Sequence, residues 1–207
     1  MRIVLFDTET NGLPISFNAL PTNVNNWPNI LSIAWELWDI LPDSVNKKDS
    51  QERYIKFNGT QWSDEAEGVH GITREYLEKH GEPGNIVCTD FIEVLKTVDM
   101  VVAHNISFDK SVFIAETFRY FPNMRVTWWP RLEYCTCNNT TELCKIQFSP
   151  PKKTAKYKKP KLIELYTYLF GSEKVSEYKF HTAADDVRCL TDCFIELIRR
   201  GHTTFKL

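Results

Sequence analysis

An acid on the apolar stripe of the last expected helix restricts how this chain can fold. In the segment 182–200, Asp186 lies on the same face as a run of apolar residues at three- and four-residue spacing. Its neighbour Asp185 is turned about 100° away and can pair with Arg188 on the next turn. We therefore expect Asp186 to face the core and Asp185 the solvent. The stripe consists of Ala183, Val187, Leu190, Phe194 and Leu197.

Three more acids occupy inward-facing positions in other segments. Asp109 precedes Val112 and Phe113 by three and four residues, which places it on the inner face of an expected helix at 107–120. Asp7 ends an apolar run at 3–7 that is typical of a buried strand, and Glu9 follows two residues later. Because side chains alternate along a strand, Asp7 and Glu9 leave the same face if the strand continues.

A buried carboxylate is unfavourable unless something compensates its charge, and four together also repel one another. One compensation is pairing with Arg or Lys, as is usual for buried acids. The other is divalent cations, since hard oxygen ligands suit Mg²⁺ or Mn²⁺ and two such ions would neutralise four negative charges. The acids are therefore candidate metal ligands, with ion pairing as the alternative.

A histidine stands close to this set. His181 precedes Asp186 by five residues, at the entrance of the last helix. An ordinary histidine pKa of about 6.5 suits proton abstraction from water at neutral pH, so His181 is a candidate general base. The alternative is a histidine that caps or packs at a helix end.

The order of the expected elements indicates an α/β protein. Three strands in succession, followed by helices that alternate with strands, predict a mixed sheet with helices on its faces. The strands are expected at 3–7, 30–40, 54–57 and 100–103, and the helices at 73–80, 89–98, 107–120, 162–170 and 182–200. Between them, residues 15–29 and 138–161 are expected to be extended loops.

The charge pattern points to one local basic segment. The formal net charge is −2, so the whole chain is not a polyanion-coating protein. Six lysines nevertheless lie between Lys152 and Lys161, with Tyr157 among them. This segment is either a solvated loop or a strip that tracks phosphates while Tyr157 stacks on a base. The candidate contacts are Lys152, Lys153, Lys156, Tyr157, Lys158 and Lys159.

Cysteines and hydropathy bear on the compartment. No apolar run reaches the roughly 18 residues of a membrane span, and the amino terminus reads as a strand and not as a signal peptide. We expect a cytoplasmic or nuclear protein that is not secreted and has no membrane partner. Most of the six cysteines should then be reduced and buried. The alternative for Cys135, Cys137 and Cys144 is a zinc site.

At these residues the sequence resembles the DEDDh exonucleases of the DnaQ-like family, which includes proofreading subunits. The first motif stands as Phe-Asp-Thr-Glu-Thr-Asn-Gly-Leu at 6–13, the second as His-Asn-Ile-Ser-Phe-Asp at 104–109, and the third as His-Thr-Ala-Ala-Asp-Asp at 181–186. Val-His-Gly-Ile-Thr at 69–73 resembles a stretch of the proofreading branch. The long loops and compact layout are similar to stand-alone viral or phage members.

The resemblance implies an RNase H-like fold with a central mixed five-stranded sheet flanked by helices, as one domain over 1–207. It implies that two Mg²⁺ or Mn²⁺ ions bind to Asp7, Glu9, Asp109 and Asp186, and that His181 deprotonates the attacking water. Thr10 and Leu13 would hold the 3′-terminal nucleotide, with Phe108 packed beside it. His70 is a further candidate for substrate contact, with turn structure as its alternative role.

The implied function is a 3′→5′ exonuclease that releases nucleoside 5′-monophosphates from DNA or RNA by two-metal hydrolysis. The expected partner is a single-stranded nucleic acid with a free 3′ end, with no obligate protein partner. The alternative is a non-catalytic adaptor that uses an exonuclease fold to bind nucleic acid. The inward-facing acids and His181 favour the enzyme.

Overall fold

The computed structural model describes residues 1–153 and 155–203. Within these residues, five strands form one mixed sheet in the order β3-β2-β1-β4-β5. β1 pairs antiparallel with β2 and parallel with β4, β3 continues antiparallel from β2, and β5 continues parallel from β4. The predicted α/β class with a mixed five-stranded sheet is therefore confirmed. The strands are β1 Arg2–Thr10, β2 Ile30–Leu41, β3 Ser44–Tyr54, β4 Met100–Ala103 and β5 Leu132–Cys135.

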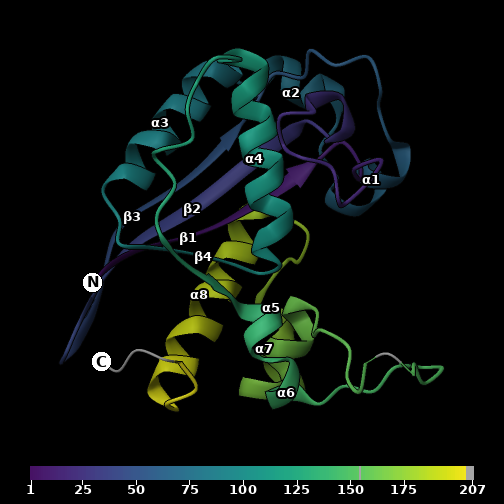
Figure 1. Ribbon diagram of the computed structural model, residues 1–207. Helices are drawn as coiled ribbons and strands as arrows, with labels where there is room; N and C mark the ends of the chain where they lie inside the picture. Colours follow the sequence, from purple (N-terminus) through teal and green to yellow (C-terminus); the bar gives the residue numbers. More distant parts are fainter. Residues whose placement is uncertain (154, 204–207) are drawn as a thin grey trace.

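Helices cover both faces of this sheet (Figure 1). α3 (Gly84–Lys96) and α4 (Ile106–Tyr120) pack on one face, where they meet Val4 and Phe6 of β1. α8 (Ala183–Arg199) packs on the other face against Ile3 and Leu5. α7 (Leu162–Phe170) contacts α8 through a third apolar cluster. Because β1 is buried on both sides, its alternating side chains reach two different layers of the molecule.

Shorter elements connect this framework. α1 (Asp64–His70) and α2 (Arg74–His80) lie between β3 and α3, and the 3₁₀ turn η1 (Val24–Asn26) lies in the loop after β1. α5 (Thr136–Asn139) and α6 (Thr141–Cys144) follow β5, and the 3₁₀ helix η2 (Ser172–Glu177) precedes α8. The segment 138–161 therefore begins with helical turns, and its loop runs from 145 to 161.

Two predicted elements were misplaced. The third strand runs over Ser44–Tyr54 and not over 54–57. The prediction was wrong because this polar strand pairs only with β2 and keeps much of its length in solvent, so its residues lack the apolar pattern of a buried strand. α3 begins at Gly84, five residues before the predicted start at 89. By contrast, β4 and α7 have the predicted bounds, and β1 continues to Thr10, so that Asp7 and Glu9 share a face.

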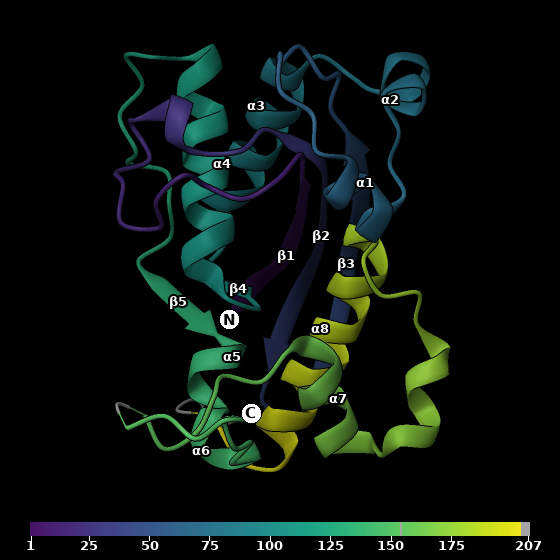
Figure 2. The same cartoon turned by 90° about the vertical axis from the view of Figure 1, so that its right-hand side faces the viewer.

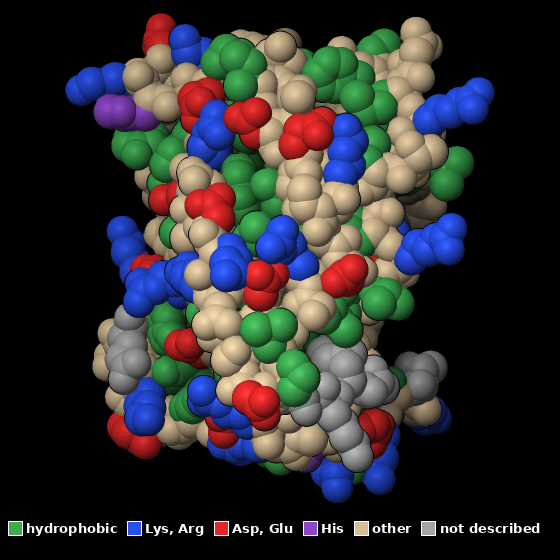
Figure 3. Space-filling model, turned by 90° about the vertical axis from the view of Figure 1, so that its left-hand side faces the viewer, with side chains coloured by type: hydrophobic (Ala, Val, Ile, Leu, Met, Phe, Trp, Pro, Cys, Tyr) green, Lys and Arg blue, Asp and Glu red, His purple; other side chains and the backbone are tan. Residues whose placement is uncertain are grey.

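The face with α3 and the β2–β3 hairpin carries both signs of charge. Figure 3 shows Lys and Arg side chains interspersed with Asp and Glu over this side of the molecule. Ion pairs account for part of the pattern, including Lys48 with Asp39 at 3.6 Å and Arg53 with Asp90 at 3.0 Å. This face therefore offers no broad surface of one sign. No helix in the described part of the chain is long and apolar enough to cross a membrane.

Candidate active site

The candidate site lies where β1 extends past the end of β4. The register of this parallel pair ends at Leu5 opposite Val102, while β1 continues beside β2 as far as Thr10. Asp7 and Glu9 therefore stand beyond the last residue that β4 pairs. Figure 2 looks onto this end of β1, with α4 to one side and α8 to the other.

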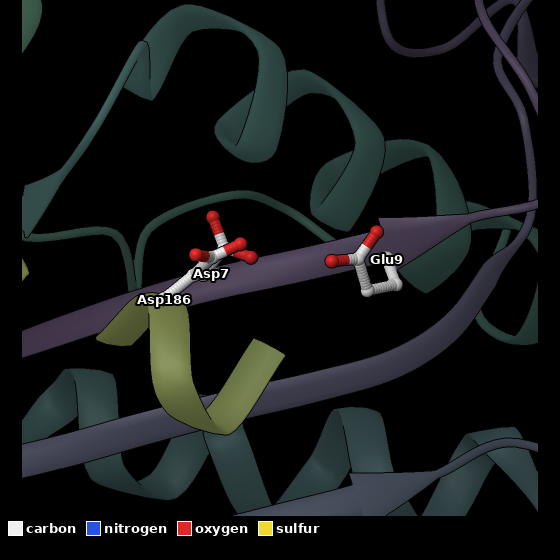
Figure 4. Close-up of side chains that lie close together, drawn as sticks. All are labelled: Asp7, Glu9 and Asp186. Carbon is white, nitrogen blue, oxygen red and sulfur yellow. The ribbon is translucent and has the colours of Figure 1, made fainter. Parts of the chain in front are cut away.

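Three carboxylates meet at this position, and we call them the acid cluster: Asp7, Glu9 and Asp186. Each offers a carboxylate oxygen, and these three oxygens lie within 4.8 Å of one another (Figure 4). The strand alternation supplies Asp7 and Glu9, and the first turn of α8 supplies Asp186. The neighbouring Asp185 instead pairs with Arg188 at 2.7 Å, as predicted.

Asp109 lies outside the acid cluster but close to it. It stands in the first turn of α4 and is only 3% exposed. Its Oδ1 accepts a hydrogen bond of 2.8 Å from the hydroxyl of Thr8, which leaves β1 between Asp7 and Glu9. The structure therefore groups three of the four predicted acids closely and holds the fourth beside them through a residue that the sequence analysis did not single out.

These acids are compensated only weakly by the protein. Burial, and then the charges of Asp109, Asp186 and Glu9, raise the pKa of Asp7 well above its ordinary value. Burial is also the main cause that raises the pKa of Glu9 to about 8 and that of Asp109 to about 7. Burial likewise raises the pKa of Asp186 to about 6. Among residues 1–153 and 155–203, no Lys or Arg forms an ion pair with any of the four.

The donor set fits a hard divalent cation. Two oxygens bound to one Mg²⁺ at about 2.1 Å lie at most about 4.2 Å apart, close to the separation within the acid cluster. All three donors are carboxylates, and a cation would offset the burial that raises their pKa values and the repulsion that adds to it at Asp7 and Glu9. The alternative of compensation by Arg or Lys does not describe this site.

Comparison with known proteins decides the family. The family model described as Exonuclease matches residues 4–194, which is most of the chain. The chain belongs to this exonuclease family. The match confirms the resemblance to DnaQ-like exonucleases and the predicted enzyme class, and the acid cluster lies inside the matched range. No curated protein sequence matches the chain.

Solved structures of exonuclease I share the fold. The E. coli enzyme in complex with a dT13 oligonucleotide aligns with a TM-score of 0.69 at 15% identity, covering 96% of this chain and 41% of that one. Exonuclease I from Methylocaldum szegediense aligns with a TM-score of 0.65 at 16% identity, covering 96% and 40%. The exonuclease domain described here thus spans about two fifths of these relatives.

His181 stands at the edge of the acid cluster of this exonuclease. It is exposed, adopts a left-handed backbone with φ of 70°, and directly precedes Thr182, the N-cap of α8. Its backbone N–H donates to Oδ2 of Asp186 at 3.2 Å. The side chain is therefore attached beside Asp186, just before the start of α8.

The predicted nucleotide contacts occupy different environments. Leu13 is exposed, and Phe108 is half-buried next to Asp109. The hydroxyl of Thr10 is already engaged, since it donates to the carbonyl of Gly12 at 2.7 Å. His70 is buried at the end of α1, and its Nδ1 accepts from the N–H of Ile72 at 2.9 Å, which is the turn role considered as its alternative.

The lysine segment is only partly free for a ligand. Lys158 forms an ion pair with Glu164 at 2.5 Å. Lys152 lies over the ring of Phe148, and Lys156 lies over the ring of Tyr157 at 5.0 Å from its centre. At the carboxyl-terminal end of the segment, the carbonyl of Pro160 accepts a hydrogen bond of 2.9 Å from the ring of His104, the first residue of the second motif. The ring of His104 is also hydrogen-bonded to Thr136 at 2.8 Å, so it braces the second motif.

The cysteines do not form the zinc site considered from the sequence. The sulfurs of Cys135 and Cys137 lie 3.6 Å apart at the end of β5. Cys144 packs in a different apolar cluster with α7 and α8. Within the described residues, the three do not meet as a metal-binding group.

Proposed function

We propose that this exonuclease domain hydrolyses the terminal phosphodiester bond at the 3′ end of single-stranded DNA or RNA and releases nucleoside 5′-monophosphates. The proposal rests mainly on the acid cluster, because a cation would favourably compensate three carboxylates within 4.8 Å that form no ion pair with Arg or Lys among the described residues. The predicted identity of the ions, Mg²⁺ or Mn²⁺, belongs to this proposal. Oxygen-only donors favour such ions.

The proposed roles follow from the positions of the side chains. The cations would be held by four carboxylates, those of Asp7, Glu9, Asp186 and Asp109. The hydrogen bond from Thr8 would orient Asp109. Divalent ions in such a site activate water and stabilise the charge on the leaving oxygen. A ring nitrogen of His181 would accept the proton of the attacking water, since the residue stands exposed beside Asp186.

The proposed substrate strand is supported by what surrounds the acid cluster. Leu13 and Phe108 offer apolar contacts for a terminal nucleotide next to the acids. Figures 1 and 2 place the loop after β1 and the described residues of the loop 145–161 on the same side of the molecule, at opposite ends. The related E. coli enzyme has been solved with single-stranded oligonucleotides, which supports a single-stranded substrate here.

The test is a time course on DNA and RNA oligomers labelled at either end, with Mg²⁺ or Mn²⁺. We expect 3′-labelled oligomers to release labelled mononucleotide at once and 5′-labelled oligomers to shorten in single steps. D7A should abolish both, whereas D185A should keep them, because Asp185 pairs with Arg188 outside the acid cluster. Tight oligomer binding without any product, with either metal, would instead identify a non-catalytic adaptor.

A further inference from the structure

The loop after β1 is uncharged and unusually apolar for a surface segment. Residues 11–29, which we call the neutral loop, contain no Asp, Glu, Lys or Arg, although such residues make up 25% of the chain. Four large apolar side chains on it are exposed: Leu13 by 76%, Ile15 by 86%, Phe17 by 63% and Leu20 by 73%. A cluster of exposed apolar side chains on one segment marks a contact surface.

Hydrogen bonds within the neutral loop keep these side chains outside. The buried amide of Asn26 accepts from the N–H of Ser16 and donates to its carbonyl, both at 2.9 Å. At the base of the loop, the N–H of Asn11 donates to the carbonyl of Asn29 at 3.1 Å. The N–H of Asn29 in turn donates to Oδ1 of Asn11 at 2.7 Å. The loop is thus held in one shape in which Ile15 and Phe17, on either side of Ser16, cannot collapse inward.

An ion pair within α4 helps to hold the neutral loop in place. Glu116 is 1% exposed and pairs with Arg119. The guanidinium of Arg119 donates to the carbonyls of Val24 at 2.8 Å and Trp27 at 2.5 Å. The returning half of the loop is therefore tied to the same helix that carries Asp109.

The apolar side chains continue directly from the active site. The ring of Phe17 lies 6.5 Å from that of Phe108, which precedes Asp109. Leu13 and Ile15 also line a cavity of about 760 Å³, whose lining includes Gln61 and Lys56 of the segment 56–63 and Arg119 of α4. Apolar surface therefore continues from Phe108, next to Asp109, onto the neutral loop, and the cavity adjoins that loop.

We propose that Ile15 and Phe17 form a stacking surface for unpaired bases upstream of the nucleotide that is removed. The inference rests on the proposed function of the acid cluster. A surface for phosphates would need cationic side chains, and the neutral loop has none. Bases of any sequence can stack on aromatic and apolar side chains, and exposed amides such as Asn18 can bond their edges.

The test compares two substrates that differ in upstream bases. One is a 12-nucleotide strand, and the other is the 4-nitrophenyl ester of thymidine 5′-monophosphate, which has none. In I15A/F17A, the ratio of kcat/KM for the strand to that for the ester should fall about ten-fold, the effect of about one lost stacking contact. The matched control is I86A, which removes a 46% exposed isoleucine from α3 and should leave the ratio within about two-fold.

A second arm asks whether the bases are what the loop contacts. For the wild type, kcat/KM should be lower by the same factor on a strand with abasic sites at the two positions before the 3′ nucleotide than on the intact strand. On this abasic strand, I15A/F17A should not lower kcat/KM further. An unchanged ratio in I15A/F17A, or an equal loss on intact and abasic strands, would overturn the proposal. So would a change in oligomeric state with base dependence retained, which would make the loop a protein interface.

The proposed function can fail separately. If the wild type hydrolyses neither substrate with Mg²⁺ or Mn²⁺, the catalytic assignment is wrong. Binding of the intact and abasic strands, measured by fluorescence anisotropy in EDTA, then tests independently whether the neutral loop contacts bases. A loss of affinity of about ten-fold in I15A/F17A for the intact strand alone would support the stacking surface, and retained affinity would overturn it.

Discussion

Removing the charge of Asp109 should stabilise the metal-free protein. Asp109 is almost fully buried in α4, and its carboxylate accepts a hydrogen bond from the Thr8 hydroxyl. In D109N the amide keeps nearly the same shape, and its oxygen can still accept from Thr8. The substitution therefore removes a buried charge without opening a cavity.

The size of the effect follows from the pKa of Asp109, which burial raises from 3.8 to about 7. The charged form is then disfavoured in the folded protein by about 1.4 kcal/mol per pH unit between these values, about 4 kcal/mol in full. This cost begins as the pH rises above about 4 and is complete above about 7, because the folded protein holds the proton longer than the unfolded chain. The same reasoning gives about 1.6 kcal/mol at pH 5.

Neighbouring acids reduce what can be measured. Asp7 and Glu9 also have raised pKa values and can take up a proton when Asp109 stays charged. We therefore expect D109N to gain about 1–3 kcal/mol more in the free energy of unfolding at pH 8 than at pH 5. At about 2–4 °C per kcal/mol for a chain of this size, the difference in Tm should be several degrees.

The assay is urea and thermal unfolding in EDTA at the two pH values, with D185N as the control. Asp185 is partly exposed and paired with Arg188, so its loss should cost the same small amount at both. Adding Mg²⁺ or Mn²⁺ should raise the Tm of the wild type more than that of D109N. If D109N were instead destabilised equally at pH 5 and pH 8 in EDTA, the carboxylate would already be compensated within the protein, and the reasoning for a cation would fail.

Three further predictions address the other parts of the site. H181A should lower kcat by roughly 10² or more while the metal-dependent rise in Tm persists, and loss of that rise would show that His181 has been given the wrong role. T8V removes the hydroxyl that lowers the pKa of Asp109, so the acid limb of the pH profile of kcat/KM should move to higher pH, and an unmoved limb would contradict this. Serine at the lysines that form no ion pair within the described residues should flatten the salt dependence of single-strand binding, whereas K158S should change it little because that lysine pairs with Glu164. An unchanged slope would exclude the lysine strip, which consists of Lys152, Lys153, Lys156 and Lys159.

Local periodicity was enough to place the acids. Alternation along β1 predicted that Asp7 and Glu9 share a face, and the helical stripe predicted that Asp186 turns inward while Asp185 pairs with Arg188. Both patterns depend only on backbone geometry, which neighbouring residues determine. The bounds of α7 were predicted for the same reason, since Gly171 follows a short apolar run.

Contacts between distant segments were the part that sequence could not supply. Thr8 and Asp109 are far apart in the chain, and only the pairing of β1 with β4 brings α4 over Thr8. The one available signal was alternation, which turns Thr8 to the face opposite Asp7. β3 was misplaced because a polar edge strand takes its conformation from its partner, and its own residues show no apolar alternation.

Because both faces of β1 contribute to the site, insertions and deletions in this strand should have a distinctive effect. Asp7 and Glu9 serve the α8 side, while Thr8 between them steadies the acid on the α4 side. A shift of one residue in the pairing of β1 with β2 would exchange the faces and disable both halves together. A one-residue insertion or deletion in β1 should therefore disrupt the whole site at once, even where the fold remains stable.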